Sequence, residues 1–211
     1  MTTESGPGRR ERNMIEKRER ISAAASELFA VQGYEPTTTQ QIADLADVSI
    51  GTVFRYVTTK AELLLMVRNA EFARAVLDGL AAADRIEDVE RAVLAAIEPV
   101  VSASRRSRDV ALYQRELMFG PVDEPYRAEG LATVMELEEG LAAILSRPAP
   151  VDQEGRDAAG AVFAVVHLAI VRAGIAGASA PDLVSQVRQI VAGHRAVTES
   201  RAGGARRGEG Q

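Results

Sequence analysis

The sequence predicts an all-α protein of about nine helices. Apolar residues recur at helical spacing along most of the 211 residues, and no β-type alternation of any length occurs. N-capping residues precede the periodic segments, and Gly or Pro follows them. A hydrophobic fraction of 46% and a charged fraction of 26% are typical of a globular protein that buries a core.

The first predicted helix runs from Arg18 to Val31. Its apolar residues fall on one face, and Gly33 follows as a C-cap. The polar residues 1–12 before it predict a flexible basic arm and do not resemble a signal peptide. Residues 9–20 contain six basic and three acidic side chains, which favours either contact with DNA phosphate or a solvated tail.

Two short helices joined by a tight turn follow. Thr38 and a Gln three residues later predict a capping box for a helix that ends near Ala46. Asp47-Val48 is the expected turn, because Asp is one of the few non-Gly residues that tolerate a left-handed backbone. Ser49 then caps a helix predicted over Ile50–Tyr56. This arrangement is the helix-turn-helix, whose second helix meets base edges in the major groove of DNA.

Six longer helices are predicted after this motif. Thr59 with Glu62 repeats the capping box and opens a helix that reaches about Leu80. Pro99 is expected to interrupt the next helix near its end, because Pro cannot donate a hydrogen bond inside a helix. The first nine residues and the Gly/Arg-rich tail are predicted to be disordered. The five helices after Leu80 are predicted at Val89–Val101, Val110–Phe119, Glu124–Leu145, Gln153–Ala173 and Pro181–Val197.

The net charge of −5 on its own argues against a nucleic-acid partner, because clustered Lys and Arg attract phosphate. The distribution of charge changes that conclusion. Residues 1–60 contain eight basic and eight acidic side chains, whereas residues 61–211 contain 17 and 22. The acidic excess therefore belongs to the C-terminal part of the chain.

Several classes of protein are excluded by composition and motif. The absence of Cys excludes disulfides and Cys-ligated zinc, and it favours a cytoplasmic location. The most apolar run, Ala158 to Val171, is shorter than the roughly 20 residues of a membrane span, so no membrane segment is expected. No Glu-x-x-His pair, nucleophile elbow, P-loop or dinucleotide fingerprint occurs. We therefore expect no catalytic residues, no metal site and no cofactor.

The second short helix carries residue types that suit DNA recognition. Small or hydroxylated side chains let a helix approach the groove closely, and Arg55 can pair with guanine. Val53 and Val57 are expected to point into the core. The alternatives are that the Thr and Ser residues act only as N-caps, that Arg55 is an ordinary surface residue and that Phe54 belongs to the core. The predicted DNA-contacting residues are Thr38, Gln40, Ser49, Ile50, Gly51, Thr52, Phe54, Arg55, Tyr56 and Lys60.

Residues 19–65 carry a family resemblance. The segment from Leu28 to Thr38 contains a Gly-Tyr corner, and the segment from Ile42 to Leu63 contains a Gly-Thr-apolar-aromatic run followed by Lys60. In order and spacing this resembles the DNA-binding domain of TetR-family transcriptional regulators. The sequence departs from the family at Asp47, where Gly is usual, at Thr39, where an aliphatic residue is more frequent, and at residues 57–58, where Phe-Pro is common. None of these departures removes a DNA-contacting residue type.

The resemblance implies a homodimer with four segments in each chain. Residues 1–12 would be the flexible arm, 13–60 the DNA-binding domain, 61–200 the effector-binding and dimerisation domain, and 201–211 a disordered tail. It also implies repression of an operator in double-stranded DNA, relieved by a small-molecule effector. An activator, or a helical ligand carrier or adaptor without DNA binding, are the alternatives. The expected effector-binding residues are Tyr113, Glu116, Phe119, Met135, Phe163, His167 and Ile170, each of which has plain core packing as its alternative.

The resemblance places the dimer interface on the last two helices. These helices combine small residues with apolar ones, which would let two copies approach closely. Packing within one protomer is the alternative for the same residues. They are Gly160, Ala161, Ala164, Val165, Leu168, Ala169, Leu183, Val187, Ile190 and Val191.

Overall fold

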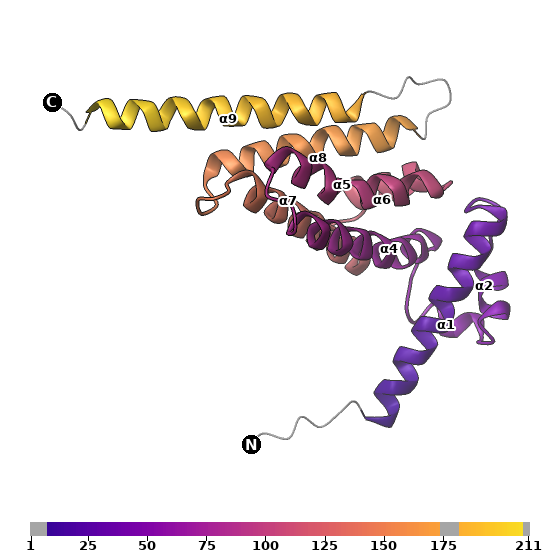
Figure 1. The fold of residues 1–211 in the computed structure, drawn as a ribbon. Coiled ribbons are helices and arrows are strands. Elements are labelled where there is room, and N and C mark those ends of the chain that lie inside the picture. The colour runs from indigo at the N-terminus through magenta and orange to yellow at the C-terminus, as the bar shows by residue number, and fades with distance from the viewer. Residues whose placement is uncertain (1–7, 174–181, 209–211) are drawn as a thin grey trace, which may run out of the picture. The chain divides into compact units, whose positions relative to one another are not determined.

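The computed structural model describes residues 8–173 and 182–208 (Figure 1). Within these ranges the chain forms nine α-helices and no strand, which confirms the predicted all-α class. The helices are α1 (Arg9–Gln32), α2 (Thr39–Leu45), α3 (Ile50–Val53), α4 (Lys60–Ala83), α5 (Val89–Arg106), α6 (Val110–Phe119), α7 (Pro125–Leu145), α8 (Gln153–Ala173) and α9 (Leu183–Gly208).

The chain divides into two compact units. The N-terminal unit contains Met1–Ala70 and Leu112–Glu129, and the C-terminal unit contains Glu71–Ala111 and Gly130–Gln211. Helices α4, α6 and α7 each contribute residues to both units. The boundary expected near residue 60 thus lies at the start of α4, ahead of the division between the units.

The terminal helices are longer than the sequence predicted. Helix α1 begins at Arg9, so residues 9–12, expected in a flexible arm, are helical. Arg and Glu are good helix formers, and no Gly or Pro follows Gly8 for 24 residues. Helix α9 runs to Gly208, into the tail predicted to be disordered, and an ion pair between Arg201 and Glu154 joins it to α8. Residues 1–7 and 209–211, also predicted to be disordered, lie outside the described residues.

Two internal helices also differ from the prediction. Helix α5 continues through Pro99, which was expected to interrupt it near its end, and reaches Arg106 instead of Val101. A proline removes one N–H from the helical ladder, and the packing of neighbouring Val100 in the core holds the helix on either side of it. Helix α3 ends at Val53 and not at Tyr56, because the chain tightens into i to i+3 hydrogen bonds, including Tyr56 N–H to Val53 C=O at 3.0 Å.

The N-terminal unit is built around α1, which packs on α2, and α2 packs on α3. The apolar face predicted for the first helix is the face that is buried. Five apolar side chains of this unit, which come from all three helices and the segment after α3, are at most 2% exposed: Ile21, Phe29, Ile42, Val53 and Val57.

The C-terminal unit has one hydrophobic core to which α4, α5, α7, α8 and α9 contribute. Helices α8 and α9 lie side by side (Figure 1). Val187 and Val191, at 0% and 1% exposed, fill this core, so these two residues pack within the protomer and not on a dimer face. Ala161, Ala164 and Leu168 of α8 remain exposed.

Candidate nucleic-acid interface

The turn between α2 and α3 begins with the predicted capping box. The Gln41 N–H donates to Thr38 Oγ1 at 3.2 Å, and the Thr38 N–H donates to Gln41 Oε1 at 2.8 Å. Both bonds satisfy donors that the first turn of a helix leaves unpaired. The entry into α2 is therefore fixed by local sequence, as predicted.

Asp47 provides the change of direction between the two helices. Its φ of 51° is the left-handed conformation that the sequence predicted for this position. Arg20 on α1 holds the turn from the other side, since its Nη2 donates to the Asp47 carbonyl at 2.7 Å and to Asp47 Oδ2 at 3.0 Å, and also to the carbonyl of Ala46. The residue that replaces the family's usual Gly thus has its own anchor.

Ser49 caps α3 as predicted. Its Oγ accepts from the Thr52 N–H at 3.2 Å and lies 2.9 Å from Thr52 Oγ1. The hydroxyls of Ser49 and Thr52 are therefore paired with each other at the exposed start of α3. One hydrogen bond fixes both side chains while leaving acceptor lone pairs for an incoming donor.

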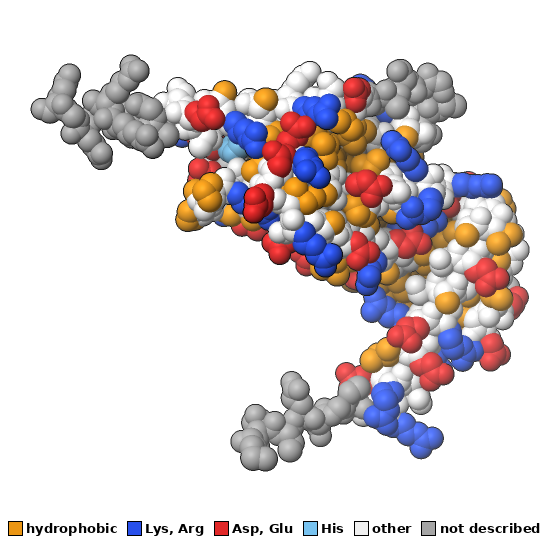
Figure 2. Space-filling model, viewed as in Figure 1, with side chains coloured by type: hydrophobic (Ala, Val, Ile, Leu, Met, Phe, Trp, Pro, Cys, Tyr) orange, Lys and Arg blue, Asp and Glu red, His pale blue; other side chains and the backbone are white. Residues whose placement is uncertain are grey.

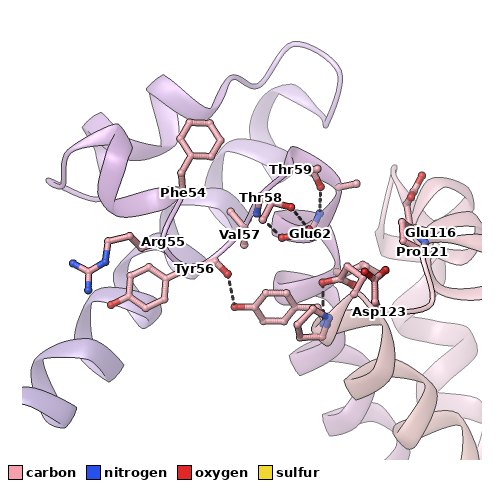
Figure 3. A pocket seen from close by; sticks show the side chains of 15 residues that line it. Phe54, Arg55, Tyr56, Val57, Thr58, Thr59, Glu62, Glu116, Pro121 and Asp123 are labelled. Atoms are coloured by element: carbon pink, nitrogen blue, oxygen red, sulfur yellow. Dashed lines mark hydrogen bonds between the residues drawn. The ribbon is translucent and has the colours of Figure 1, made fainter.

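The outward face of α3 combines exposed side chains with one glycine. Val53 is fully buried, whereas Ile50 is 37% exposed and Phe54 is 47% exposed. Arg55 is exposed as well, and Figure 3 shows it on the same side of the segment as Tyr56. A Cβ added at Gly51 would meet no atom closer than Ser49 Oγ at 4.0 Å. Nothing inside the described protein therefore requires Gly51 to be small.

Two predicted contact residues have side chains that are used inside the protein. The Lys60 ammonium donates to the carbonyls of Tyr34, Glu35 and Thr37 at 2.9, 3.2 and 3.1 Å, and it lies 4.1 Å from the centre of the Tyr34 ring. Since an ammonium has three donors, all of them are used, and only the backbone at the start of α4 is left for phosphate. Gln40, also predicted, is exposed and donates to Asp44 Oδ1 at 2.7 Å.

Tyr56 is held in place at both its hydroxyl and its carbonyl. Its hydroxyl donates to the Met14 carbonyl at 3.0 Å, and its carbonyl accepts from the Tyr126 hydroxyl at 3.3 Å. The Arg18 guanidinium lies 5.4 Å from the centre of the Tyr126 ring and 3.6 Å from Glu129. Burial raises the pKa of the Tyr126 hydroxyl above 10.0, which keeps it a donor. The segment after α3 is thus anchored to α1 and to the start of α7.

A second set of bonds continues this anchor into α4 and α6. Asn69, 1% exposed, donates from Nδ2 to the Tyr126 carbonyl at 2.6 Å, and its Oδ1 accepts from the Tyr113 hydroxyl at 2.9 Å. A cavity of about 530 Å³ lies beside Tyr126 (Figure 3). Its lining includes the segment after α3, the first turn of α4 and the residues around Tyr126.

Basic side chains lie at the start of α1, at the lower end of the view in Figure 2. Arg9, Arg10 and Lys17 are exposed. Arg18 and Arg20 instead contact the protein, as described above. The segment predicted as a basic arm therefore divides into exposed cations on the first turns of α1 and structural cations nearer the turn.

The predicted effector residues are distributed over both units. Tyr113 is buried and bonded to Asn69, and Glu116 pairs with Arg115 at 2.6 Å. Phe119 is 82% exposed and Met135 is 68% exposed. Of these four residues, Glu116 lines the 530 Å³ cavity described above.

The remaining effector candidates lie on α8. The rings of Phe163 and His167 are 5.9 Å apart, and Ile170 is 4% exposed. His167 was predicted as an effector residue with core packing as the alternative, and its buried Nδ1 has no hydrogen-bond partner among the described residues. Burial lowers the pKa of His167 below 6.5, since the charged imidazolium is the form that burial disfavours.

Arg20, Tyr126 and Asn69 position the recognition segment, and none of them was predicted to do so. A single sequence offers no local signal for Arg20 and Tyr126, because their partners are 26 to 70 residues away. Asn69 did carry a signal. It is a polar residue on the apolar side of a helix, three residues after buried Met66 and four after buried Leu65.

Two kinds of feature are absent from the described ranges. No group of three or more His, Asp or Glu side chains is arranged there to hold a metal ion. No helix within residues 8–173 and 182–208 is long and apolar enough to cross a membrane.

The chain is similar to known regulatory proteins in sequence and fold. Residues 21–67 match the family model described as bacterial regulatory proteins, tetR family. The chain is 32% identical to the HTH-type transcriptional regulator TcmR of Streptomyces glaucescens over 155 residues, which cover 72% of this chain and 68% of TcmR.

Solved structures show the same fold. A TetR transcriptional regulator from Rhodococcus sp. RHA1 superimposes with a TM-score of 0.67 at 17% identity, covering 86% of this chain and 97% of that one. FadR of Thermus thermophilus, a TetR-family transcriptional repressor solved with lauroyl-CoA, superimposes with a TM-score of 0.59 at 26% identity, covering 82% and 91%.

Proposed function

Because the chain belongs to the TetR family of DNA-binding transcriptional regulators, we propose that it is a homodimeric repressor that releases its operator when a small, mainly apolar effector binds. The observation that carries the proposal is the exposed face of α3. Its helix entry, turn and exit are fixed by capping and by Arg20, whereas the side chains of Arg55 and Phe54 are left outward. A face that is rigidly held and yet unused within the protein suits recognition of an external surface.

The roles at this face follow from chemistry. Arg55 is the candidate for bidentate pairing with guanine, and Phe54 for contact with sugar or a thymine methyl group. Ser49 and Thr52 accept or donate toward phosphate from the start of α3, and Thr38 does so from the start of α2. The backbone N–H groups at the start of α4, beside Lys60, add a phosphate contact from the other flank.

A palindromic operator requires two recognition helices about 34 Å apart, which a dimer supplies. The exposed small and apolar residues of α8, Ala161, Ala164 and Leu168, support the proposal that this helix contributes to the dimer interface. On α9, Val184 is 43% exposed and offers a second apolar contact. Two such helices from each protomer would form a four-helix interface.

The proposed release mechanism uses α4. This helix begins at Lys60, beside the recognition segment, and continues without a break to Ala83 in the C-terminal unit. A ligand that binds the C-terminal unit and displaces α4 would change the spacing of the two recognition helices. The free energy of release must come from tighter binding of the ligand to the conformation that does not bind DNA. The acyl-CoA bound by the FadR neighbour supports an effector with a long apolar part.

A gel shift with DNA flanking the protein's own gene tests the proposal, first with the protein alone and then with a ligand panel that includes lauroyl-CoA. We expect retardation that ligand reverses, and sedimentation of the free protein as a dimer. A protein that fails to retard this DNA and random DNA alike would contradict the DNA-binding role. Ligand that strengthens retardation would instead indicate an activator or a co-repressor mechanism.

A further inference from the structure

Three arginines occupy the turn between α5 and α6. Arg105 and Arg106 are the last residues of α5, and Arg108 follows two residues later. All three are exposed. Three positive charges within four residues is a high local density in a part of the chain whose net charge is negative.

Among the described residues these arginines have no carboxylate partner, which in the same unit is also true of the separate residues Arg85, Arg91 and Arg172. Six arginines elsewhere in the C-terminal unit form ion pairs within 4.0 Å of Asp or Glu, whereas none of these three pairs with a carboxylate in the described part of the chain. Arg106 has one hydrogen bond, from Nη1 to Ser102 Oγ at 3.2 Å. Asp109, the acidic side chain of this turn, already has an interaction of its own.

A favourable helix dipole explains only part of this arrangement. Cations are stabilised near the C-terminal end of a helix, which accounts for Arg105 and Arg106. Arg108 lies beyond the helix end, which is capped by the Ser107 N–H donating to the Ser104 carbonyl at 3.2 Å. A further cation there adds repulsion unless an anion is present.

The same three arginines line a cavity of about 430 Å³ that also has an apolar side. Val110 and Ile170, 9% and 4% exposed, contribute apolar surface, and Ala173 completes it. Ser107 lines the cavity too, and its buried Oγ has no hydrogen-bond partner among the described residues. The cavity therefore combines three guanidinium groups, an unsatisfied hydroxyl and an aliphatic surface.

We propose that this cavity binds the phosphate group of an amphipathic ligand, with the apolar part of the ligand against Val110 and Ile170. Guanidinium groups match phosphate because they donate two parallel hydrogen bonds to its oxygens. Three cations suit a group of charge near −2 better than a single carboxylate. That this ligand is the effector rests on the proposed function. Ile170 is the predicted effector residue that this cavity contains.

Calorimetric titration of the full chain with octyl phosphate tests the site without DNA. We expect one octyl phosphate bound per chain, and tighter binding than for octanoate. Ethyl phosphate should bind more weakly, by about fourfold for each methylene no longer buried. Octyltrimethylammonium, which has the same chain and the opposite charge, should not bind. Equal binding of the cation and the phosphate would overturn the proposal.

The matched variants separate this site from general electrostatics. Arg105→Ala/Arg108→Ala should weaken octyl phosphate binding by about tenfold or more, because charge-assisted hydrogen bonds are lost. Arg85→Ala removes an exposed arginine elsewhere in the same unit and should leave the affinity within about twofold. Thermal unfolding checks that the variants remain folded. An unchanged affinity in the double variant would refute the site.

A gel shift on the same variants keeps the two proposals distinct. The double variant should retard operator DNA as the parent does, but with less sensitivity to octyl phosphate. If the double variant loses octyl phosphate binding while the ligand never releases DNA, the site is supported and its role as the effector site is refuted. If the double variant retards DNA poorly and still binds octyl phosphate normally, the arginines contact DNA and the proposal is wrong.

Discussion

Replacing Gly51 with Ala should separate protein stability from DNA binding. Gly51 lies in the first turn of α3, and a Cβ built there would meet no atom closer than Ser49 Oγ at 4.0 Å. The added methyl group therefore has open space around it in the free protein. It projects from the face that we propose to contact the major groove.

The two effects of this change have opposite signs. Ala is favoured over Gly in a helix by about 0.5–1 kcal/mol, so the free energy of unfolding should rise slightly. In a chain of this size, each kcal/mol of added stability raises Tm by about 2–4 °C. Against DNA, a methyl group forced into a close-packed contact costs about 1–3 kcal/mol. The Kd for the operator should therefore rise by about 5- to 150-fold.

Gly33→Ala is the matched control, since it is the same substitution in the same unit. Gly33 ends α1 at φ 85° and ψ 170°, a conformation that costs an L-residue about 1–3 kcal/mol. That variant should lose stability. Thermal unfolding and a gel shift on both variants complete the test. If Gly51→Ala binds its operator as tightly as the parent, the start of α3 does not approach DNA closely, and our assignment of the interface is wrong.

Three further changes test helix capping, a buried set of hydrogen bonds and the pH dependence of stability. Thr38→Ala removes the capping box of α2 and should lower the free energy of unfolding by about 1 kcal/mol, as measured by urea denaturation. An unchanged midpoint of the urea transition would show that the capping box does not stabilise the protein. Asn69→Leu removes the bonds that Asn69 makes with the Tyr126 carbonyl and the Tyr113 hydroxyl, and it should lower the free energy of unfolding by about 2–5 kcal/mol. Tyr113→Phe should cost less in that background than in the parent, because the bond between the two side chains is already lost; an equal cost in both backgrounds would contradict that bond. Because burial lowers the pKa of His167, the unfolded chain takes up a proton first as pH falls, so stability should be full above pH 6.5 and decrease below it. His167→Gln should reduce that decrease in calorimetry between pH 5 and 8, and an identical pH profile would assign it to other groups.

Features that depend on neighbouring residues were predictable from sequence. The capping box at Thr38, the left-handed Asp47 and the cap at Ser49 each depend on atoms within a few residues, and the structure contains all three. The inward placement of Val53 and Val57 follows from helical spacing in the same way. Predictions of this kind succeed because their physical cause lies inside the stretch of sequence being read.

Helix ends were less predictable, because they depend on competing small effects. The start of α1 at Arg9 reflects favourable propensities of charged residues, which an apolar pattern does not register. The end of α3 depends on whether the next turn forms i to i+4 or i to i+3 hydrogen bonds. Tyr56 N–H donates to the Val53 carbonyl, which is an i to i+3 bond. Pro99 did not interrupt α5, which extends past the predicted end at Val101 because packing on the core outweighs one missing hydrogen bond.

Side-chain roles that depend on distant partners were not predictable. Lys60 was predicted from its position to approach phosphate, but its ammonium is saturated by carbonyls 23 to 26 residues earlier in the chain. Arg20 contributed to the prediction only as a charge, yet it holds the turn at Asp47. The sequence shows which residue type stands at a position, but the fold determines which acceptors its hydrogen-bond donors contact.

Basic side chains that already contact groups within the protein set an upper limit on the salt dependence of DNA binding. Residues 1–60 are neutral overall, and Arg18, Arg20 and Lys60 already contact acceptors or rings in the protein. In each protomer, the N-terminal cations with no partner in the described ranges are Arg9, Arg10, Lys17 and Arg55. Because each neutralised phosphate contributes about 0.9 to the slope, log affinity should fall with log salt no more steeply than about −7 for a dimer. Titration of operator binding between 50 and 300 mM salt measures the slope. A value near −10 would mean that Lys60 or the other structural cations leave their partners on DNA, whereas a flat response would exclude phosphate contact altogether.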